Sequence, residues 1–345
     1  MGVDLTGGLD DAREFVFPRQ PDNPEMRESV NVWAWDDGVE FGFPRIGVEA
    51  VADQWETHDQ QVNLAFPNGR VLLIHEPGKV HDPIGADGQP RVLGAGALSF
   101  ELVEPFRHWR MRLAGDAVET TVDAQMKGQR PDSASRVPVE LELDIRSAAP
   151  PWENGALVAE AARVLEEQEE GALMGGPRFE QLFRATGSFT VDGETRAVRG
   201  GGLRIRRQGI RRLARFWGHA WQSAVFPSGR AFGYIVYPPR DDGKATYNEG
   251  YLFEGDGDLV PATVVDAPWL RRMQPKGEDV SVVLETEQGT TSIQAETQIS
   301  TFSVIGTETG AFPILQQAIV RYTLDGESAN GMMERSMPPD QVERP

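Results

Sequence analysis

The sequence predicts an all-β fold, and three observations carry that prediction. Short segments in which apolar and polar residues alternate recur along the chain, turn residues separate these segments, and a single stretch shows helical spacing. Alternation with a period of two places apolar side chains on one face of a strand. Turn signals at intervals of about 8–12 residues are typical of antiparallel sheets.

The alternating segments define the predicted strands. They lie at 29–35, 70–75, 97–103, 139–145, 188–191, 232–237, 280–286 and 318–324. Turn sequences with Asn-Gly, Asp-Gly or Ser-Gly lie between them, at 67–69, 86–90, 191–194, 227–230, 241–244 and 255–258. Because such turns favour hairpins, we expect successive strands to pair antiparallel.

One stretch, 154–170, predicts an amphipathic helix that ends at Gly171. The residues at helical spacing are Leu157, Ala161, Val164, Leu165 and Gln168. Proline and glycine flank this stretch, which is typical of a linker. We therefore expect an N-terminal β domain at 1–150, a helical linker at 151–177, a C-terminal β domain at 178–337 and a flexible tail at 338–345.

Composition excludes several function classes. The formal net charge of −19 opposes general nucleic-acid binding, because most of the surface would repel a polyanion. No apolar run approaches the roughly 18–20 residues that span a bilayer, and no secretory signal is visible at the first residues. The absence of cysteine excludes disulfides and thiolate chemistry. We expect a cytoplasmic location, while a homo-oligomer stays open.

The segment 196–215 departs from this composition, since it holds eight arginines and no acidic residue. One interpretation is a site for a small anion such as a carboxylate or phosphate. The alternative is a solvated strand face or an internal network of ion pairs with the many acidic residues.

Motifs for several kinds of chemistry are missing. The five histidines show no metal-ligand spacing, and no G-x-S-x-G motif is present. The glycines at 200–202 do not fit a dinucleotide fingerprint, and D-G-D at 256–258 lacks the other ligands of a calcium loop. We expect neither a metal nor a cofactor, which leaves acid–base chemistry on an apolar substrate, or binding alone.

His219 is the first candidate for acid–base chemistry. On a strand, Trp217 and Trp221 share its face, so the imidazole would sit in a partly apolar wall suited to proton transfer. The alternative is a core histidine that a backbone carbonyl satisfies.

Two further clusters combine aromatic and acidic residues. Tyr247 and Glu249 lie in T-Y-N-E-G-Y, where Glu249 is a candidate partner of His219 or general acid; the alternative is an exposed hairpin turn. Trp33 and Trp35 share a strand face as a candidate cavity wall; the alternative is ordinary core.

The chain also resembles the carotenoid 1,2-hydratase/AttH-like superfamily, and within it a bacterial subgroup of uncharacterised activity. The matching segments are N-P-E-M-R-E-S-V-N-V-W (23–33), F-E-L-V-E-P-F-R-H-W (100–109), R-F-E-Q-L-F-R-A-T-G-S-F-T-V-D-G (178–193), G-G-G-L-R-I-R-R-Q-G-I-R-R-L (200–213), G-H-A-W-Q-S (218–223) and M-E-R-S (333–336). The resemblance implies two lipocalin-like (calycin-type) antiparallel β-barrels side by side, one connecting helix, and an apolar ligand cavity near their interface.

One departure from the superfamily matters. Many relatives carry R-D-H-S-W-G where this chain reads R-I-R-R-Q-G, so Arg206 occupies the histidine position and Gln208 the tryptophan position. If that histidine acts in relatives, His219 is the nearest replacement here. The resemblance also implies that 199–215 forms inner strands of the second domain, with its charge serving internal carboxylates.

Together these features favour a hydro-lyase that adds water to an alkene, or removes it from a tertiary alcohol, of a hydrophobic molecule such as a terpenoid. His219 or Glu249 would be the acid. The candidate substrate-binding residues are Trp33, Trp35, Trp217, Trp221, Gln222, Tyr247, Arg204 and Arg206. The alternatives are a non-catalytic carrier of a lipid, steroid or terpenoid, and a pericyclase-like cyclase.

Overall fold

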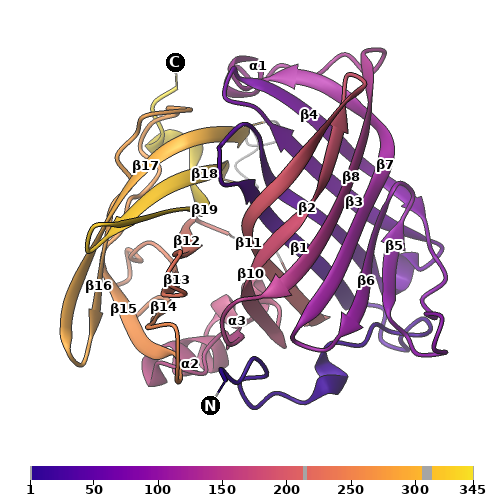
Figure 1. The fold of residues 1–345 in the computed structure, drawn as a ribbon. Helices are drawn as coiled ribbons and strands as arrows, with labels where there is room; N and C mark the ends of the chain where they lie inside the picture. Colours follow the sequence, from indigo (N-terminus) through magenta and orange to yellow (C-terminus); the bar gives the residue numbers. More distant parts are fainter. Residues whose placement is uncertain (1, 213–215, 305–312, 345) are drawn as a thin grey trace.

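The computed structural model describes residues 2–212, 216–304 and 313–344, in which two β structures stand side by side (Figure 1). The strands of the first are β1 (Met26–Asp36), β2 (Gly42–Val51), β3 (Thr57–Ala65), β4 (Arg70–Lys79), β5 (Val92–Ala95), β6 (Leu98–Glu104), β7 (His108–Thr121), β8 (Arg136–Ser147), β9 (Trp152–Glu153), β10 (Arg178–Val191) and β11 (Glu194–Ile210). They pair antiparallel in the order β4-β3-β2-β1-β11-β10-β8-β7-β6-β5. Because β4 also pairs with β7, the sheet returns on itself.

The second structure is a closed antiparallel barrel. Its strands are β12 (His219–Val225), β13 (Ala231–Val236), β14 (Asn248–Phe253), β15 (Val260–Asp266), β16 (Val282–Thr286), β17 (Gly289–Ser303), β18 (Ile314–Leu324) and β19 (Glu327–Met337). The first and last strands pair with each other, which closes the barrel. The expected all-β, two-barrel lipocalin-like class is therefore confirmed.

The helices are short. They are α1 (Val122–Met126), α2 (Ala159–Glu167) and α3 (Glu169–Met174), with 3-10 turns at Asp11–Arg13, Ala52–Gln54 and Pro339–Gln341. The single helix predicted for 154–170 is thus two helices, because Gln168 adopts an extended conformation between them. Gly171 lies within α3, and Gly175, in the left-handed conformation, ends that helix. Among the described residues, no helix is long and apolar enough to cross a membrane.

The sheets divide the chain at a different place from the predicted domain boundaries at 150 and 178. Strands β10 and β11 are hydrogen-bonded to β8 and β1, so residues 178–210 complete the first sheet. The expectation that 199–215 forms inner strands of the second domain is therefore wrong for its strand portion. Residues 213–215, with the eighth arginine, Arg215, lie outside the described residues. The β10–β11 hairpin forms between neighbouring segments of the chain. Its place in the first sheet, however, depends on pairing with β8 and β1, which are distant in the sequence.

Alternation along β1 and β11 gives the first sheet two buried faces. Val30 and Val32 point into the first core, whereas Trp33 points the other way, towards the second barrel. There its ring meets that of Trp221 from β12 edge-on, with ring centroids 4.7 Å apart. Such a pair stabilises an interface by about 0.5–1.5 kcal/mol beyond its buried area. The two β structures are thus joined by a packed apolar contact.

The three consecutive glycines of β11 allow this close packing. A Cβ at Gly202 would lie 2.2 Å from the Phe183 ring and 2.3 Å from the Trp33 carbonyl, and one at Gly201 would lie 3.2 Å from the Trp35 ring. A Cβ at Gly200 would lie 1.8 Å from the Trp35 carbonyl oxygen. Gly200 and Gly202 therefore leave no room for a side chain, whereas one at Gly201 would force its neighbours to shift by a few tenths of an ångström. The glycines therefore serve strand packing.

The inward face of β11 carries buried cations. Arg204 pairs with Glu14 and lies 4.9 Å from the centre of the Trp109 ring, and Arg206 pairs with Glu28 at 2.6 Å. All four charged side chains are almost fully buried. The expectation that part of the arginine-rich segment serves internal carboxylates is confirmed at these two positions. It follows that the N-terminal segment is held to the first barrel by Glu14.

We expect Glu14→Gln to lower the free energy of unfolding by about 3–5 kcal/mol, because it leaves the Arg204 guanidinium buried without its counter-charge. Chemical denaturation measures the change. The matched control is Glu25→Gln, whose ion pair with Arg212 is exposed and should contribute less than about 1 kcal/mol. Equal losses for the two variants would contradict a stabilising role for the buried pair.

Candidate functional site

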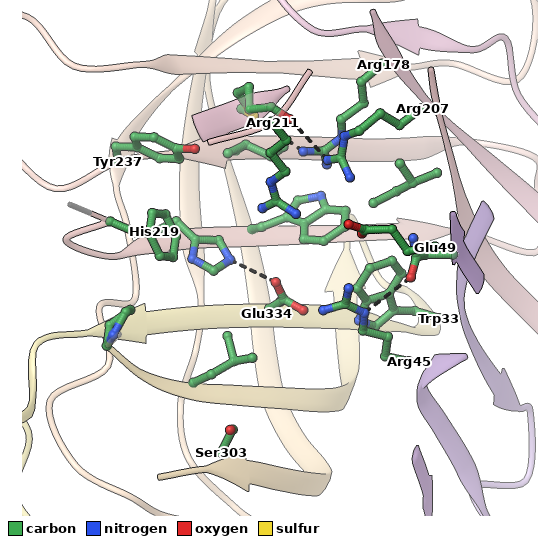
Figure 2. Close-up of a pocket in the computed structure, with 18 residues that line it drawn as sticks. Trp33, Arg45, Glu49, Arg178, Arg207, Arg211, His219, Tyr237, Ser303 and Glu334 are labelled. Atoms are coloured by element: carbon green, nitrogen blue, oxygen red, sulfur yellow. Dashed lines mark hydrogen bonds and ion pairs between the residues drawn. The ribbon is translucent and has the colours of Figure 1, made fainter. Parts of the chain in front are cut away.

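A cavity of about 350 Å³ lies between the two β structures. This volume is in the range of small-molecule sites. Its wall combines apolar side chains, Trp33, Ile205, Trp221, Ile235 and Leu315, with charged ones, Arg45, Glu49, Arg178, Arg207, Arg211, His219 and Glu334 (Figure 2). The cavity therefore lies where the resemblance implied, but it is more highly charged than an apolar ligand alone would need.

Pairing of β12 with β19 assembles the titratable centre of this cavity. His219 lies opposite Ser336, and Trp221 lies opposite Glu334. His219 Nδ1 is 2.7 Å from Ser336 Oγ, and His219 Nε2 is 3.2 Å from Glu334 Oε1. The imidazole is thus held at both nitrogens, and Figure 2 shows His219 and Glu334 facing each other within the cavity.

Glu334 is held as a carboxylate. Burial alone would raise the pKa of Glu334, but the hydrogen bond and charge of His219, with smaller contributions from Arg45 and Gln317, lower it to about 2. At neutral pH a negative charge therefore lies 3.2 Å from His219 Nε2. A buried carboxylate beside an imidazole is an arrangement suited to proton transfer.

A chain of hydrogen bonds continues from Glu334 away from the cavity. Gln317 Nε2 donates to Glu334 Oε2 at 2.6 Å, and Asn63 Nδ2 donates to Gln317 Oε1 at 2.8 Å. His75 Nε2 lies 2.7 Å from Asn63 Oδ1. Burial, with the charge of Arg45, lowers the pKa of His75 to about 4, so the ring is neutral and donates through Nε2. Every amide in the chain donates towards Glu334, which fixes the orientation of its carboxylate.

Ser336, His219 and Glu334 are the residue types of a nucleophilic triad and contact one another in that order. The position of Ser336, however, does not suit a nucleophile. Ser336 has no exposed surface and is not part of the cavity wall. A nucleophile must reach the substrate. Ser336 therefore orients the imidazole, and His219 is the member of the three that presents a titratable group to the cavity together with Glu334.

Two other charged groups of the wall, Arg178 and Glu49, form ion pairs with residues outside it. Arg178 pairs with Glu180 and lies 5.2 Å from the centre of the Trp221 ring, while Glu49 pairs with Arg27. Burial, partly offset by Arg211 and Arg178, raises the pKa of Tyr237 to about 12, so its phenol stays protonated at neutral pH. Among the described residues, no group of three or more His, Asp or Glu side chains is arranged to hold a metal ion.

Of the residues predicted from the sequence, the cavity brings together Trp33, His219 and Trp221. Trp35 is buried in the same interface cluster but is not part of the cavity wall. Trp217 donates from Nε1 to the Pro238 carbonyl and lies beside a separate surface hollow.

Glu249 has a different environment from the one expected. Its carboxylate accepts hydrogen bonds from the Trp152 indole, from the Tyr247 hydroxyl and from backbone N–H groups, those of Gly155, Leu157 and Val158. These bonds tie the segment before α2 to β14. Glu334, and not Glu249, is the carboxylate beside His219. Tyr247, whose hydroxyl donates to Glu249, belongs to this hydrogen-bonded group and not to the cavity wall.

The remaining predicted residues point into the two barrels. Gln222 donates to the Val280 carbonyl within the second barrel, on the strand face opposite to that of Trp221. Arg204 and Arg206 lie inside the first barrel with Glu14 and Glu28. The period of two along a strand separates these residues from the cavity.

Sequence reasoning missed Glu334 as a site residue, although it lies in the M-E-R-S motif. Its role depends on pairing between strands whose contacting residues, His219 and Ser336, are 117 positions apart. It also missed Arg45, Arg207 and Arg211 in the cavity wall. The run of arginines could be recognised in the sequence. Which side chains point into the first barrel and which into the cavity could not be predicted from it.

Comparisons with known proteins place the fold. A family model described as Domain of unknown function (DUF7064) matches residues 10–339. The structure is similar to that of an AttH-like protein from Nitrosomonas europaea, with 16% identity, a TM-score of 0.59 and coverage of 94% of this chain and 99% of the other. No curated protein matches the chain.

Two further solved structures are similar over most of their length. Kievitone hydratase from Nectria haematococca has 9% identity, a TM-score of 0.51 and coverage of 97% of this chain and 96% of the other. CghA with Sch210972 has 12% identity, a TM-score of 0.47 and coverage of 93% of each chain. The resemblance to the AttH-like superfamily is therefore confirmed for the fold.

The Glu334 carboxylate should contribute to the pH dependence of stability. Because its pKa is about 2 in the folded protein and ordinarily 4.5, its contribution is complete above about 4.5 and is lost as the pH falls towards 2. The shift corresponds to about 3 kcal/mol. We expect the difference in unfolding free energy between the wild type and Glu334→Gln, measured by denaturation at several pH values, to shrink across that window. Glu334→Asp, which keeps a carboxylate, is the control; a difference for Glu334→Gln that is constant with pH would contradict this assignment.

Proposed function

The chain belongs to the DUF7064 family, and we propose that it is a hydro-lyase that adds water to an alkene, or removes it from a tertiary alcohol, of a largely apolar small molecule. The observation that carries this proposal is the His219–Glu334 pair in the wall of a partly open cavity beside two indole rings. In this proposal His219 supplies the proton, Glu334 balances its charge, and the two indole rings lie beside the reacting carbon.

In the hydration direction, protonated His219 donates its proton to one carbon of the double bond, which leaves a tertiary carbocation on the other. The faces of Trp33 and Trp221 stabilise this cation. Water then forms the new C–O bond and returns a proton to His219, so the enzyme ends as it began. Dehydration is the same sequence in reverse.

Glu334 has a supporting part in this scheme. Its carboxylate supplies the counter-charge for the proton that the imidazole carries in this scheme, and the hydrogen bond from Gln317 keeps the carboxylate turned towards His219. Ser336 fixes the ring through Nδ1. The similarity of the fold to that of kievitone hydratase agrees with this class of reaction, but the argument depends on the residues of this chain.

We expect His219→Gln to reduce turnover by about 10²–10⁴-fold without unfolding the protein, because it removes the proton donor. Geranic acid and geraniol, which share a skeleton with a terminal trisubstituted alkene, are the test substrates. Mass spectrometry after incubation in ¹⁸O-labelled water detects incorporation of the label into a tertiary alcohol.

His81→Gln, which changes a histidine of the first barrel outside the cavity, is the matched control and should retain turnover. Equal label incorporation by wild type and His219→Gln would remove His219 from the mechanism. Binding of both compounds with no label incorporated by the wild type would favour the carrier of apolar ligands instead.

A further inference from the structure

The cavity is cationic in a strongly acidic chain. Four arginines and two glutamates line it, which leaves a formal excess of two positive charges when His219 is neutral, whereas the whole chain carries −19. An apolar ligand needs no such excess, because buried unpaired cations are costly. The charge of the wall therefore points to a ligand that carries the opposite charge.

The two carboxylates of the wall, Glu49 and Glu334, offset only part of the charge of the four arginines. Against the effect of burial, the charges of Arg207 and Arg211 lower the pKa of Glu49. Glu49 forms its ion pair with Arg27, Glu334 faces His219, and Arg178 pairs with Glu180, two residues along β10. In the part of the chain that the structure describes, Arg45, Arg207 and Arg211 form no ion pair within 4.0 Å, although all three line the cavity.

The side chains of Arg207 and Arg211 are anchored by hydrogen bonds that use only some of their N–H groups. The Nε of Arg207 donates to the Gly175 carbonyl at 2.9 Å and its Nη2 to the Met174 carbonyl at 3.1 Å, while the Nε of Arg211 donates to the Leu173 carbonyl at 2.9 Å. The carbonyls at the end of α3 thus hold both side chains in place. Within the described ranges, no hydrogen bond uses the Nη1 group of Arg207 or either Nη group of Arg211, so these groups remain as donors.

Figure 2 shows Arg178, Arg207 and Arg211 gathered on one side of the cavity, above His219 and Glu334 in this view. Burial, reinforced by repulsion from Arg211 and Arg178, lowers the pKa of Arg207 well below its usual range. Burial also lowers the pKa of Arg211, although the charge of Glu49 opposes that shift. A bound anion would relieve both effects by supplying charge-assisted hydrogen bonds.

We propose that the cavity binds an apolar substrate with one carboxylate, held by Arg207 and Arg211, whose hydrocarbon body lies against Trp33 and Trp221 and reaches His219. The guanidinium fork fits the planar carboxylate. A monoanion fits better than a phosphate, because Glu49 and Glu334 in the same cavity would repel a second negative charge. This assignment of substrate class deepens the proposed function and rests on it for the reaction, but the carboxylate site stands on the arginines alone.

The test compares geranic acid with geraniol, which differ only in the head group, by calorimetric titration of the full chain near neutral pH. We expect the wild type to bind the acid at least about tenfold more tightly, and high salt to weaken binding of the acid but not of the alcohol. Arg211→Gln should lose this preference, and Arg211→Lys should keep part of it.

The matched control is Arg212→Gln, since Arg212 is the next residue but is exposed and pairs with Glu25. It should retain the wild-type preference for the acid. Thermal unfolding of each variant verifies that it is folded. If wild type bound acid and alcohol equally, or bound neither, or if folded Arg211→Gln kept the full preference and lost only stability, the arginines would serve only to hold α3 and the proposal would be overturned. Tighter binding of geranyl phosphate than of geranic acid would overturn the choice of a carboxylate.

The two proposals fail separately. His219→Gln should keep the wild-type preference for geranic acid over geraniol, because the arginines that hold the carboxylate are unchanged. A preference for the acid without label incorporation would leave the carboxylate site standing and remove the hydro-lyase. Hydration of geraniol with no preference for the acid would do the reverse.

Discussion

The two-residue alternation of β11 is the constraint on which the rest of the structure depends. This strand is hydrogen-bonded between β1 and β10, and both of its faces are buried. Arg204 and Arg206 consequently enter the first barrel, where Glu14 and Glu28 neutralise them, while Arg207 turns to the cavity. One run of similar residues therefore performs two tasks, because a strand assigns successive side chains to opposite environments.

The cavity lies where the two β structures meet. Trp33 and Trp221 make the close contact, and α3 covers one side through Met174. The strands that form this interface also deliver the charged groups, so the apolar walls and the His219–Glu334 pair are positioned by the same packing. Groups built on paired strands are held more rigidly than groups on loops, and this suits a site that must orient a proton.

Much of the fold could be predicted from the sequence. Each predicted strand overlaps an observed one, because the alternation of a half-buried strand is visible within a few residues of sequence. Hairpin turns such as that at 67–69 are also recognisable, because they favour glycine. The helix at 154–170 was found but divided, since Gln168 breaks it. The candidate site was predicted less completely: Trp33, His219 and Trp221 meet in the cavity, whereas Glu249 anchors the segment before α2.

The sequence by itself determined the strand pattern, the absence of cysteine chemistry and the presence of an arginine-rich strand ahead of His219. Only the tertiary structure decided that β10 and β11 complete the first sheet and that Glu334 is the partner of His219. The physical reason is the sequence separation over which each interaction acts. Alternation and turn propensity act between near neighbours, but the contact of β12 with β19 joins residues 117 positions apart, and the closure of the barrel alone brings them together.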